Sequence, residues 1–153
     1  MNLPIQAMRA PILVFGWGNP ARGDDALGLL FVERIEALGL SGVDCLQDDQ
    51  LQIEHALDLA ERKRILFVDA SRSLAAPFAI SRLAAAQDPA QVFTHALAPQ
   101  ALLRVFEDFH AVLPPPSYLL EIRGENFSLG APCSAAGLRH LTTALEWAKK
   151  WLK

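Results

Sequence analysis

Three polar side chains, far apart along the chain, are the candidates for chemistry in this sequence. Asp25 follows a glycine-rich turn, and Asp69 follows the apolar run 65–68. His95 lies shortly before a helical pattern that begins near Pro99, where a lone histidine is more often a surface or hydrogen-bonded residue than a ligand. Two carboxylates and one imidazole can bind a divalent first-row metal ion and leave coordination positions open. The residues alone therefore indicate a divalent-metal site and do not identify the reaction.

The glycine-rich turn lies between an apolar strand and a helix. Residues 12–15 are continuously apolar, as in a buried parallel strand, and the Gly-Trp-Gly-Asn-Pro segment 16–20 interrupts them. Apolar positions from 27 to 38 then repeat at helical spacing. In open α/β sheets ligands bind beyond the carboxyl ends of the strands. We therefore expect the turn to present Asp24 and Asp25 at that edge.

Two other interpretations of the turn are open. Gly16, Gly18 and Ala21 fit the G-x-G-x-x-A pattern of a dinucleotide-binding turn. Pro20 lacks the backbone N–H that a pyrophosphate would accept, and the following acids would repel it. Capping of a helix would explain either acid alone, but it explains the pair less easily.

Further acids follow the next strands. Asp48 and Asp49 follow a short strand at 43–46, where a solvated turn is favoured and a place in the same cleft is the alternative. A helix is predicted over 53–62, with His55 as a solvated surface histidine. Asp69 alone would suit a turn, but adjacent parallel strands end side by side, which favours a ligand role.

The rest of the chain completes an α/β pattern. Residues 77–83 have the character of an edge strand, which would run antiparallel to its neighbour if a short connection returns it. A helix from Pro99, a strand at 118–122 and a helical stripe from 138 to 152 follow. We expect a three-layer αβα fold with a mostly parallel, mixed five-stranded twisted sheet. A single domain is expected over 1–153, with a flexible N-terminal segment at 1–10.

Composition narrows the function classes. The chain has 153 residues, 52% of them hydrophobic, and a net charge of −3 with no run of Lys or Arg. Nucleic acid and membrane surfaces are therefore not expected as partners. Cys45 and Cys133 lack C-x-x-C spacing and are interpreted as reduced thiols. No signal peptide or bilayer-spanning apolar run is found, so a cytoplasmic protein is expected.

The turn and several later segments resemble the nickel–iron hydrogenase maturation proteases. The pattern G-x-G-N-x-x-x-x-D-[DE]-x-x-G is met by Gly16, Gly18, Asn19, Asp24, Asp25 and Gly28. The strand that ends in Asp69 is similar to the family, as is His95 with a leucine two residues later and a helix beyond. The resemblance extends from about Pro11 to the C-terminal helix.

This resemblance implies a function. Family members remove the C-terminal extension of a nickel–iron hydrogenase large-subunit precursor after nickel insertion. The resemblance implies a metal-dependent endopeptidase of aspartic or metallo type with the phosphorylase/hydrolase-like fold. Its partner would be the hydrogenase precursor, which would also supply the nickel. Asp25, Asp69 and His95 would be the catalytic and metal-binding residues. Substrate contacts would come from Gly16, Gly18, Asn19, Asp24 and Asp49.

Two competing functions are kept. A nucleotide-binding Rossmann-like protein would use the Gly16–Gly18 turn, and a non-catalytic hydrogenase assembly chaperone would hold the precursor's tail without shortening it. Many family members carry Glu where this chain has Asp25, whose side chain is one methylene shorter.

Overall fold

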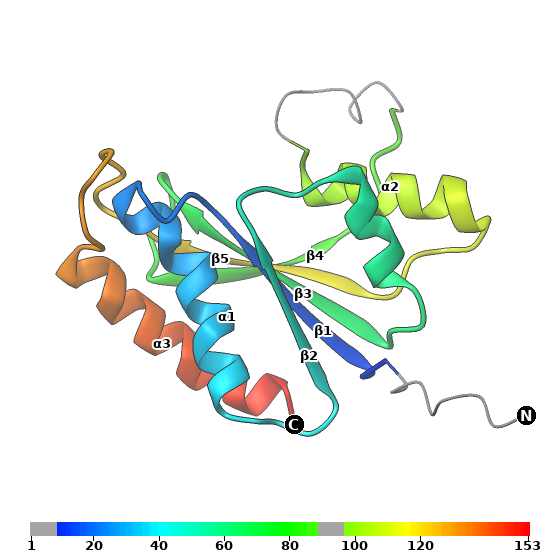
Figure 1. Cartoon of the computed structure of the whole chain (residues 1–153), viewed down its shortest axis with the longest axis horizontal. Coiled ribbons are helices and arrows are strands. Elements are labelled where there is room, and N and C mark those ends of the chain that lie inside the picture. Colours follow the sequence, from blue (N-terminus) through cyan, green and yellow to red (C-terminus); the bar gives the residue numbers. More distant parts are fainter. Residues whose placement is uncertain (1–8, 89–96) are drawn as a thin grey trace, which may run out of the picture.

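A computed structural model describes residues 9–88 and 97–153. A five-stranded sheet lies at the centre, with strand order β2-β1-β3-β5-β4 (Figure 1). The strands are β1 Ile12–Trp17, β2 Val43–Asp48, β3 Arg64–Ser71, β4 Phe78–Leu83 and β5 Ser117–Arg123. The α-helices are α1 Leu27–Ala37, α2 Pro99–His110 and α3 Ala135–Trp151, and the 3-10 helices are η1 Gly23–Ala26 and η2 Ile53–Leu59.

The sheet is parallel except at one edge. β1 pairs with β2 and β3, and β3 pairs with β5, all in parallel, whereas β4 runs antiparallel to β5. The predicted mixed, mostly parallel sheet in a three-layer α/β fold is confirmed. The predicted antiparallel edge strand is β4, and its neighbour is β5 rather than the preceding strand β3.

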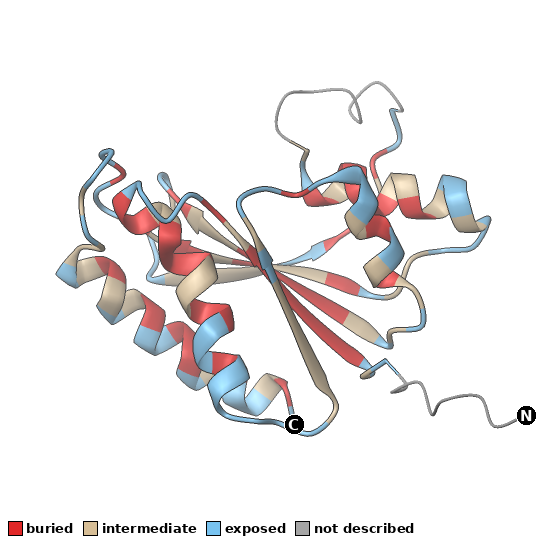
Figure 2. Ribbon diagram, viewed as in Figure 1, coloured by how far each residue is buried: buried red, intermediate tan, exposed pale blue. Residues whose placement is uncertain are grey.

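Two apolar layers cover the two faces of the sheet. On one face α1 and α3 pack against the side chains of Val14, Leu66 and Leu120. On the other face η2 and α2 pack against Phe15 and Phe67. Figure 1 shows α1 and α3 on one side of the sheet and α2 on the other, and Figure 2 shows buried residues along the inner strands. This alternation decides which face each residue of a strand reaches.

Two predicted elements differ in detail. The helix expected over 53–62 is wrong, because η2 is a 3-10 helix that ends at Leu59. Its end has a local cause, since Ala60 is extended with ψ 146° and Glu61 has φ 64°. The second difference concerns Asp69, which lies within β3 because that strand continues to Ser71.

Part of the expected N-terminal segment lies outside the described residues. Residues 1–8 are among those not described, so the expectation for 1–10 is tested only at its end. There the Arg9 guanidinium donates hydrogen bonds to the backbone oxygens of Leu57 and Ala60 at 2.6 and 3.2 Å. In the part of the chain that the structure describes, no helix is both long and apolar enough to span a bilayer.

Candidate functional site at the carboxyl edge of the sheet

Asp25 is held over the end of β1 by close backbone packing. A Cβ at Gly28 would lie 2.7 Å from the Val68 oxygen and 2.9 Å from the Trp17 oxygen, so only glycine lets this helix start sit on β1 and β3. A Cβ at Gly18, which has φ 151°, would lie 1.9 Å from the Asp25 oxygen. The glycines of the turn therefore bring Asp25 to the ends of two strands.

The turn also orients the Asp25 carboxylate. The Asn19 backbone N–H donates to Asp25 Oδ2 at 2.7 Å. The Asn19 side chain accepts from the Ala21 N–H at 2.9 Å, and the Arg22 N–H donates to the Asn19 oxygen at 3.1 Å, which closes the turn. The Asn19 N–H, which a bound phosphate would need as a donor, is thus already bonded to the Asp25 carboxylate. This geometry disfavours the nucleotide-binding alternative.

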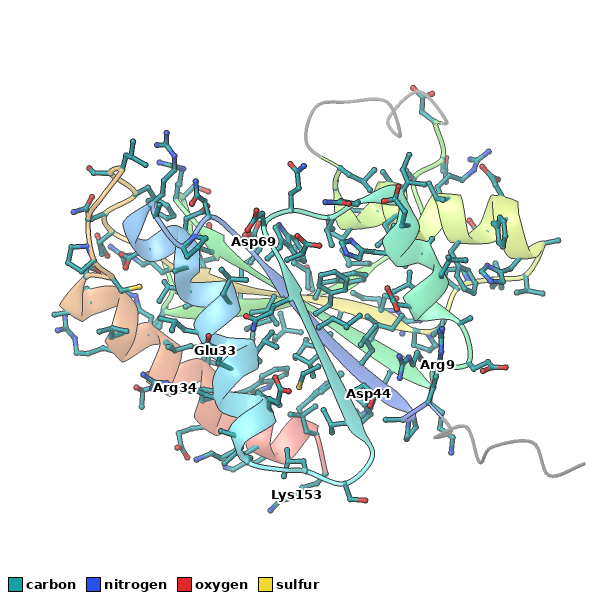
Figure 3. All side chains as sticks on the ribbon, viewed as in Figure 1. Arg9, Glu33, Arg34, Asp44, Asp69 and Lys153 are labelled. Carbon is teal, nitrogen blue, oxygen red and sulfur yellow. The ribbon has the colours of Figure 1, made fainter. Side chains whose placement is uncertain are left out.

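Asp69 lies on the face of the sheet that α2 and η2 cover. It follows Phe67 by two residues in β3, so both side chains project to the same face. Trp17, whose ring centroid is 6.0 Å from that of Phe67, lies at the end of β1 on that face. Glu121 of β5 is the register partner of Asp69. Figure 3 labels Asp69 at this end of the strands.

The half-buried carboxylate of Asp69 has few interactions that stabilise its charge. Burial, with smaller contributions from the charges of Asp25 and Glu121, raises its pKa to about 7, although the Ala70 N–H donates one hydrogen bond to Oδ1 at 2.8 Å, which lowers the pKa. The electrostatic contribution of Asp25 shows that the two predicted acids, 44 residues apart in the chain, lie near each other. Such a pair can share a proton or face a cation.

The third predicted ligand, His95, lies outside the described residues, as do all of 89–96. The chain resumes at Leu97, which packs against the apolar layer that contains Phe67, and α2 begins at Pro99 as predicted. Within 9–88 and 97–153, no three His, Cys, Asp or Glu side chains form a group able to hold a metal ion. That result does not include His95, so the predicted three-residue set stays a prediction.

The expectation that Asp24 contacts substrate needs correction, because its side chain is completely buried. Asp24 Oδ2 accepts hydrogen bonds from the Glu125 N–H at 2.7 Å, the Asn126 N–H at 3.1 Å and the Ser134 hydroxyl at 2.6 Å. Its Oδ1 accepts from the Ser134 N–H at 2.7 Å. Asp24 therefore ties η1 to the loop after β5 and to the start of α3.

The electrostatics of Asp24 agree with this structural role. Burial by itself would raise its pKa, but the hydrogen bonds from the Ser134 side chain and from three backbone N–H groups outweigh burial and lower the pKa below 3.8. Ser134 is the N-cap of α3, where its hydroxyl accepts from the Gly137 N–H at 2.9 Å. The carboxylate thus also lies near the positive end of α3.

The remaining predicted substrate-contact residues lie around the turn and beyond β2. Gly16 and Gly18 pack against the chain at Gly28 and Asp25, and Asn19 is exposed. Asp49 is exposed just after β2, and its N–H donates to Asp48 Oδ1 at 2.7 Å. Substrate contact by these four residues stays a prediction.

Sequence reasoning missed the pairing of His55, which is not a solvated surface histidine. Only 15% of its side chain is exposed, its Nε2 lies 3.2 Å from Asp48 Oδ2, and its ring meets Phe15 edge-on at 4.6 Å. His55 Nδ1 accepts from the Gln52 N–H at 2.9 Å, as a Glu or Gln does in a capping box. The three-residue spacing from Gln52 was the available signal.

Glu121 is a second residue that sequence reasoning missed. It stands two residues after Leu119, whose side chain packs on the α2 face, so it shares a face with Asp69. A carboxylate that directly follows the apolar segment 118–120, near the carboxyl end of the strand, was the signal.

The two thiols are not equipped as nucleophiles. Burial, with smaller contributions from Glu36 and Asp44, raises the pKa of Cys45 to about 11. Burial also raises the pKa of Cys133, as does the charge of Asp24. Both thiols therefore stay protonated near neutral pH.

The fold and the edge carboxylates define an α/β protein with an acidic site where its parallel strands end. No protein-family model and no curated protein matches the chain. Solved structures do, and the chain has the fold of the hydrogenase maturation proteases.

Two of these structures illustrate the similarity. One is a [NiFe] hydrogenase maturation protease HycI from Thermococcus kodakarensis KOD1, with a TM-score of 0.71 and 21% identity, covering 92% of this chain and 91% of that one. Another is the hydrogenase maturating endopeptidase HybD from E. coli, with a TM-score of 0.68 and 24% identity, covering 90% and 88%.

Proposed function

We propose that this chain is an endopeptidase that removes the C-terminal extension of a nickel–iron hydrogenase large-subunit precursor after nickel has been inserted. The observation that carries the proposal is the juxtaposition of Asp25 and Asp69 at the carboxyl edge of a sheet with the maturation-protease fold. The two acids come from the two segments in which the sequence resembles that family.

Nickel in this proposal belongs to the substrate. Asp25, Asp69 and His95 would contribute carboxylate and imidazole donors, which suit a divalent first-row ion. A cation facing Asp25 and Asp69 would offset the repulsion between their carboxylates. A carboxylate with few hydrogen bonds of its own is therefore suited to bind a cation. Cleavage would then depend on a loaded precursor, because the empty precursor lacks the ion that these acids bind.

Asp25 and Asp69 would hold and orient the precursor's ion. A nickel ion held there would supply Lewis acidity near the peptide carbonyl. Asp25, fixed by the Asn19 N–H, would orient the loaded centre. Asp69, whose repulsion by Asp25 the ion would offset, would supply the second carboxylate that holds the loaded centre.

Mass spectrometry of purified precursor tests this proposal. Nickel-loaded and nickel-free precursors are incubated with the protein, and we expect shortening only of the loaded form. Asp25→Asn, Asp69→Asn and His95→Ala should each reduce the rate by at least about a hundredfold. Glu146→Gln, an exposed carboxylate on α3, is the matched control and should process at the normal rate.

The outcomes separate the competing functions. Stable binding of loaded precursor without shortening would support the assembly chaperone instead. Normal trimming by Asp69→Asn or by His95→Ala would overturn the ligand assignment. Binding of NAD with no response to nickel-loaded precursor would support the nucleotide-binding alternative.

A further inference from the structure

The outer edge of β2 is an open strand edge. Among residues 9–88 and 97–153, β2 pairs only with β1. The Ile12 N–H donates to the Gly42 oxygen at 3.2 Å and the Gly18 N–H to the Asp48 oxygen at 3.3 Å, so the even-numbered residues of β2 bond to β1. The outward-facing N–H and C=O groups are those of Val43, Cys45 and Gln47.

A groove of about 300 Å³ follows this edge. Glu36 and Leu40, at the end of α1, form one wall, Asp58 and Arg62 form the other, and β2 lines the floor. Figure 1 shows β2 between α1 on one side and the 3-10 helix η2 on the other. An added strand would therefore continue the sheet between the same two layers that cover it.

The groove is acidic. Its charged lining consists of Glu36, Asp44, Asp58 and Arg62. The Arg62 guanidinium is already bound to Asp44, and Arg62 also donates to the Ala10 and Asp58 backbone oxygens. Within the described part of the chain, Glu36 and Asp58 form no ion pair. Two carboxylates are thus left to receive cationic side chains, while the outward N–H and C=O groups require an extended backbone.

The groove lies along Val43–Leu46, and β2 continues from it to the carboxyl edge of the sheet. β2 ends at Asp48, the register partner of Trp17, and the β1–α1 turn with Asp25 follows Trp17 directly. The residue of an added strand beside Asp48 would be level with Asp69 and three strand spacings, roughly 14 Å, from it. An extended chain covers that distance in about four residues. A bound segment could therefore extend to Asp69 with a short linker.

We propose that the open edge of β2 accepts an extended segment of the polypeptide substrate, rich in lysine or arginine, as a sixth strand. The identity of that polypeptide as the hydrogenase precursor rests on the proposed function. The acidic walls select a basic segment, and the strand edge selects an extended one. A second copy of this chain, paired edge to edge, is the competing occupant.

Amide hydrogen exchange followed by NMR tests the proposal on the full chain. The probe is a capped peptide of about ten residues with alternating valine and lysine, and the matched control peptide has glutamate in place of lysine. The lysine peptide should slow exchange at the Cys45 and Gln47 amides at least about tenfold. Leu46, whose amide already bonds to β1, should change little. The glutamate peptide should protect none of them.

Two variants isolate the backbone contact from the side chain. Gln47→Pro removes an outward N–H without removing a bond to β1, so it should abolish protection of Cys45. Gln47→Ala keeps that N–H, so the Cys45 amide should still be protected by the lysine peptide. If Gln47→Pro lowers the thermal midpoint strongly, Glu36→Lys serves instead, since it changes only the charge of the groove and should weaken binding of the lysine peptide.

Each outcome of the exchange experiment either supports or contradicts binding of a basic extended segment at the edge of β2. No protection by the lysine peptide up to about millimolar concentration, or equal protection by both peptides, would overturn the proposal. Protection that appears on concentrating the protein alone would assign the edge to a second copy. With loaded precursor, Gln47→Pro should raise KM and leave kcat unchanged. Peptide protection without precursor cleavage would contradict the proposed function alone, and cleavage without protection would contradict this inference alone.

Discussion

Two neighbouring regions built around aspartates differ in how well their carboxylates are satisfied. At the foot of α3, Asp24 accepts four hydrogen bonds, and its pKa is lowered despite complete burial. At the carboxyl edge of the sheet, Asp69 accepts one hydrogen bond and faces two like charges, and its pKa is raised to about 7. The first region uses a carboxylate to hold segments together, whereas the second leaves one available for a ligand.

The contrast shows why adjacent residues in one motif have different roles. Asp24 and Asp25 are neighbours in η1, but Asp24 points toward α3 and Asp25 lies over the end of β1. A buried carboxylate with all its hydrogen bonds stabilises the fold. A buried carboxylate with few hydrogen bonds destabilises the fold, and such groups are found mainly at functional sites. The predictions below test this division, beginning with the largest expected change in the free energy of unfolding.

Loss of the Asp24 carboxylate should have the largest effect. Asp24→Ala would leave the partly buried N–H groups of Glu125 and Ser134 without acceptors and remove a buried, four-fold bonded carboxylate, so we expect a loss of about 3–5 kcal/mol in the free energy of unfolding. Urea denaturation at neutral pH measures it. Asp25→Ala, which loses one exposed hydrogen bond, is the control and should lose less than about 1 kcal/mol. Equal losses would remove the distinction between the two acids.

The second prediction concerns the pH dependence due to Asp69. Its pKa of about 7 in the folded chain exceeds its ordinary value of 3.8, so the folded state binds a proton that the unfolded state releases. The contribution of Asp69 to stability must therefore fall as pH rises from about 4 to about 7. Asp69→Asn cannot ionise, and its stability relative to wild type should increase by on the order of 2–4 kcal/mol across that window.

The measurement is a series of urea denaturations between about pH 4 and pH 8, without divalent metal. Asp108→Asn, an exposed carboxylate on α2 that pairs with Arg104, is the control and should show no such trend. A constant difference between Asp69→Asn and wild type across the series would show that Asp69 is ordinary in its environment.

A smaller effect is expected from the hydroxyl of Ser134. Ser134→Ala removes the N-cap of α3 and one of the four hydrogen bonds to Asp24, which should cost about 1–2 kcal/mol. The pKa of Asp24 should also rise, because the Ser134 hydroxyl is the strongest of the groups that lower it. Thermal denaturation and carboxylate NMR titration check the two parts. Ser128→Ala, an exposed hydroxyl in the same loop, should change neither.

Much of the architecture could be predicted because it depends on local patterns. The continuous apolar runs in β1 and β3 require two covered faces, and the helical stripe beginning at Leu27 requires one. Parallel strands end at a shared edge, and that rule brought Asp25 and Asp69 together before any coordinates.

What could not be predicted depends on contacts between distant segments. The partners of Asp24 lie about a hundred residues away, and nothing near position 24 identifies the Ser134 hydroxyl as its donor. The burial of His55 results from the packing of η2 on Phe15. The helical pattern of the sequence placed His55 on the polar side of its helix, so this contact could not be predicted. The role of β2 as an open edge follows from strand order, which no single segment encodes.

The bonds of Asp24 to the Ser134 region also bear on how the protein is made. During synthesis the groups of Ser134 that fix Asp24 are made 110 residues after Asp24 itself. A nascent chain that has not yet released α3 cannot lock the turn. The turn beside Asp25 is therefore completed only after the segment around Ser134 has been made.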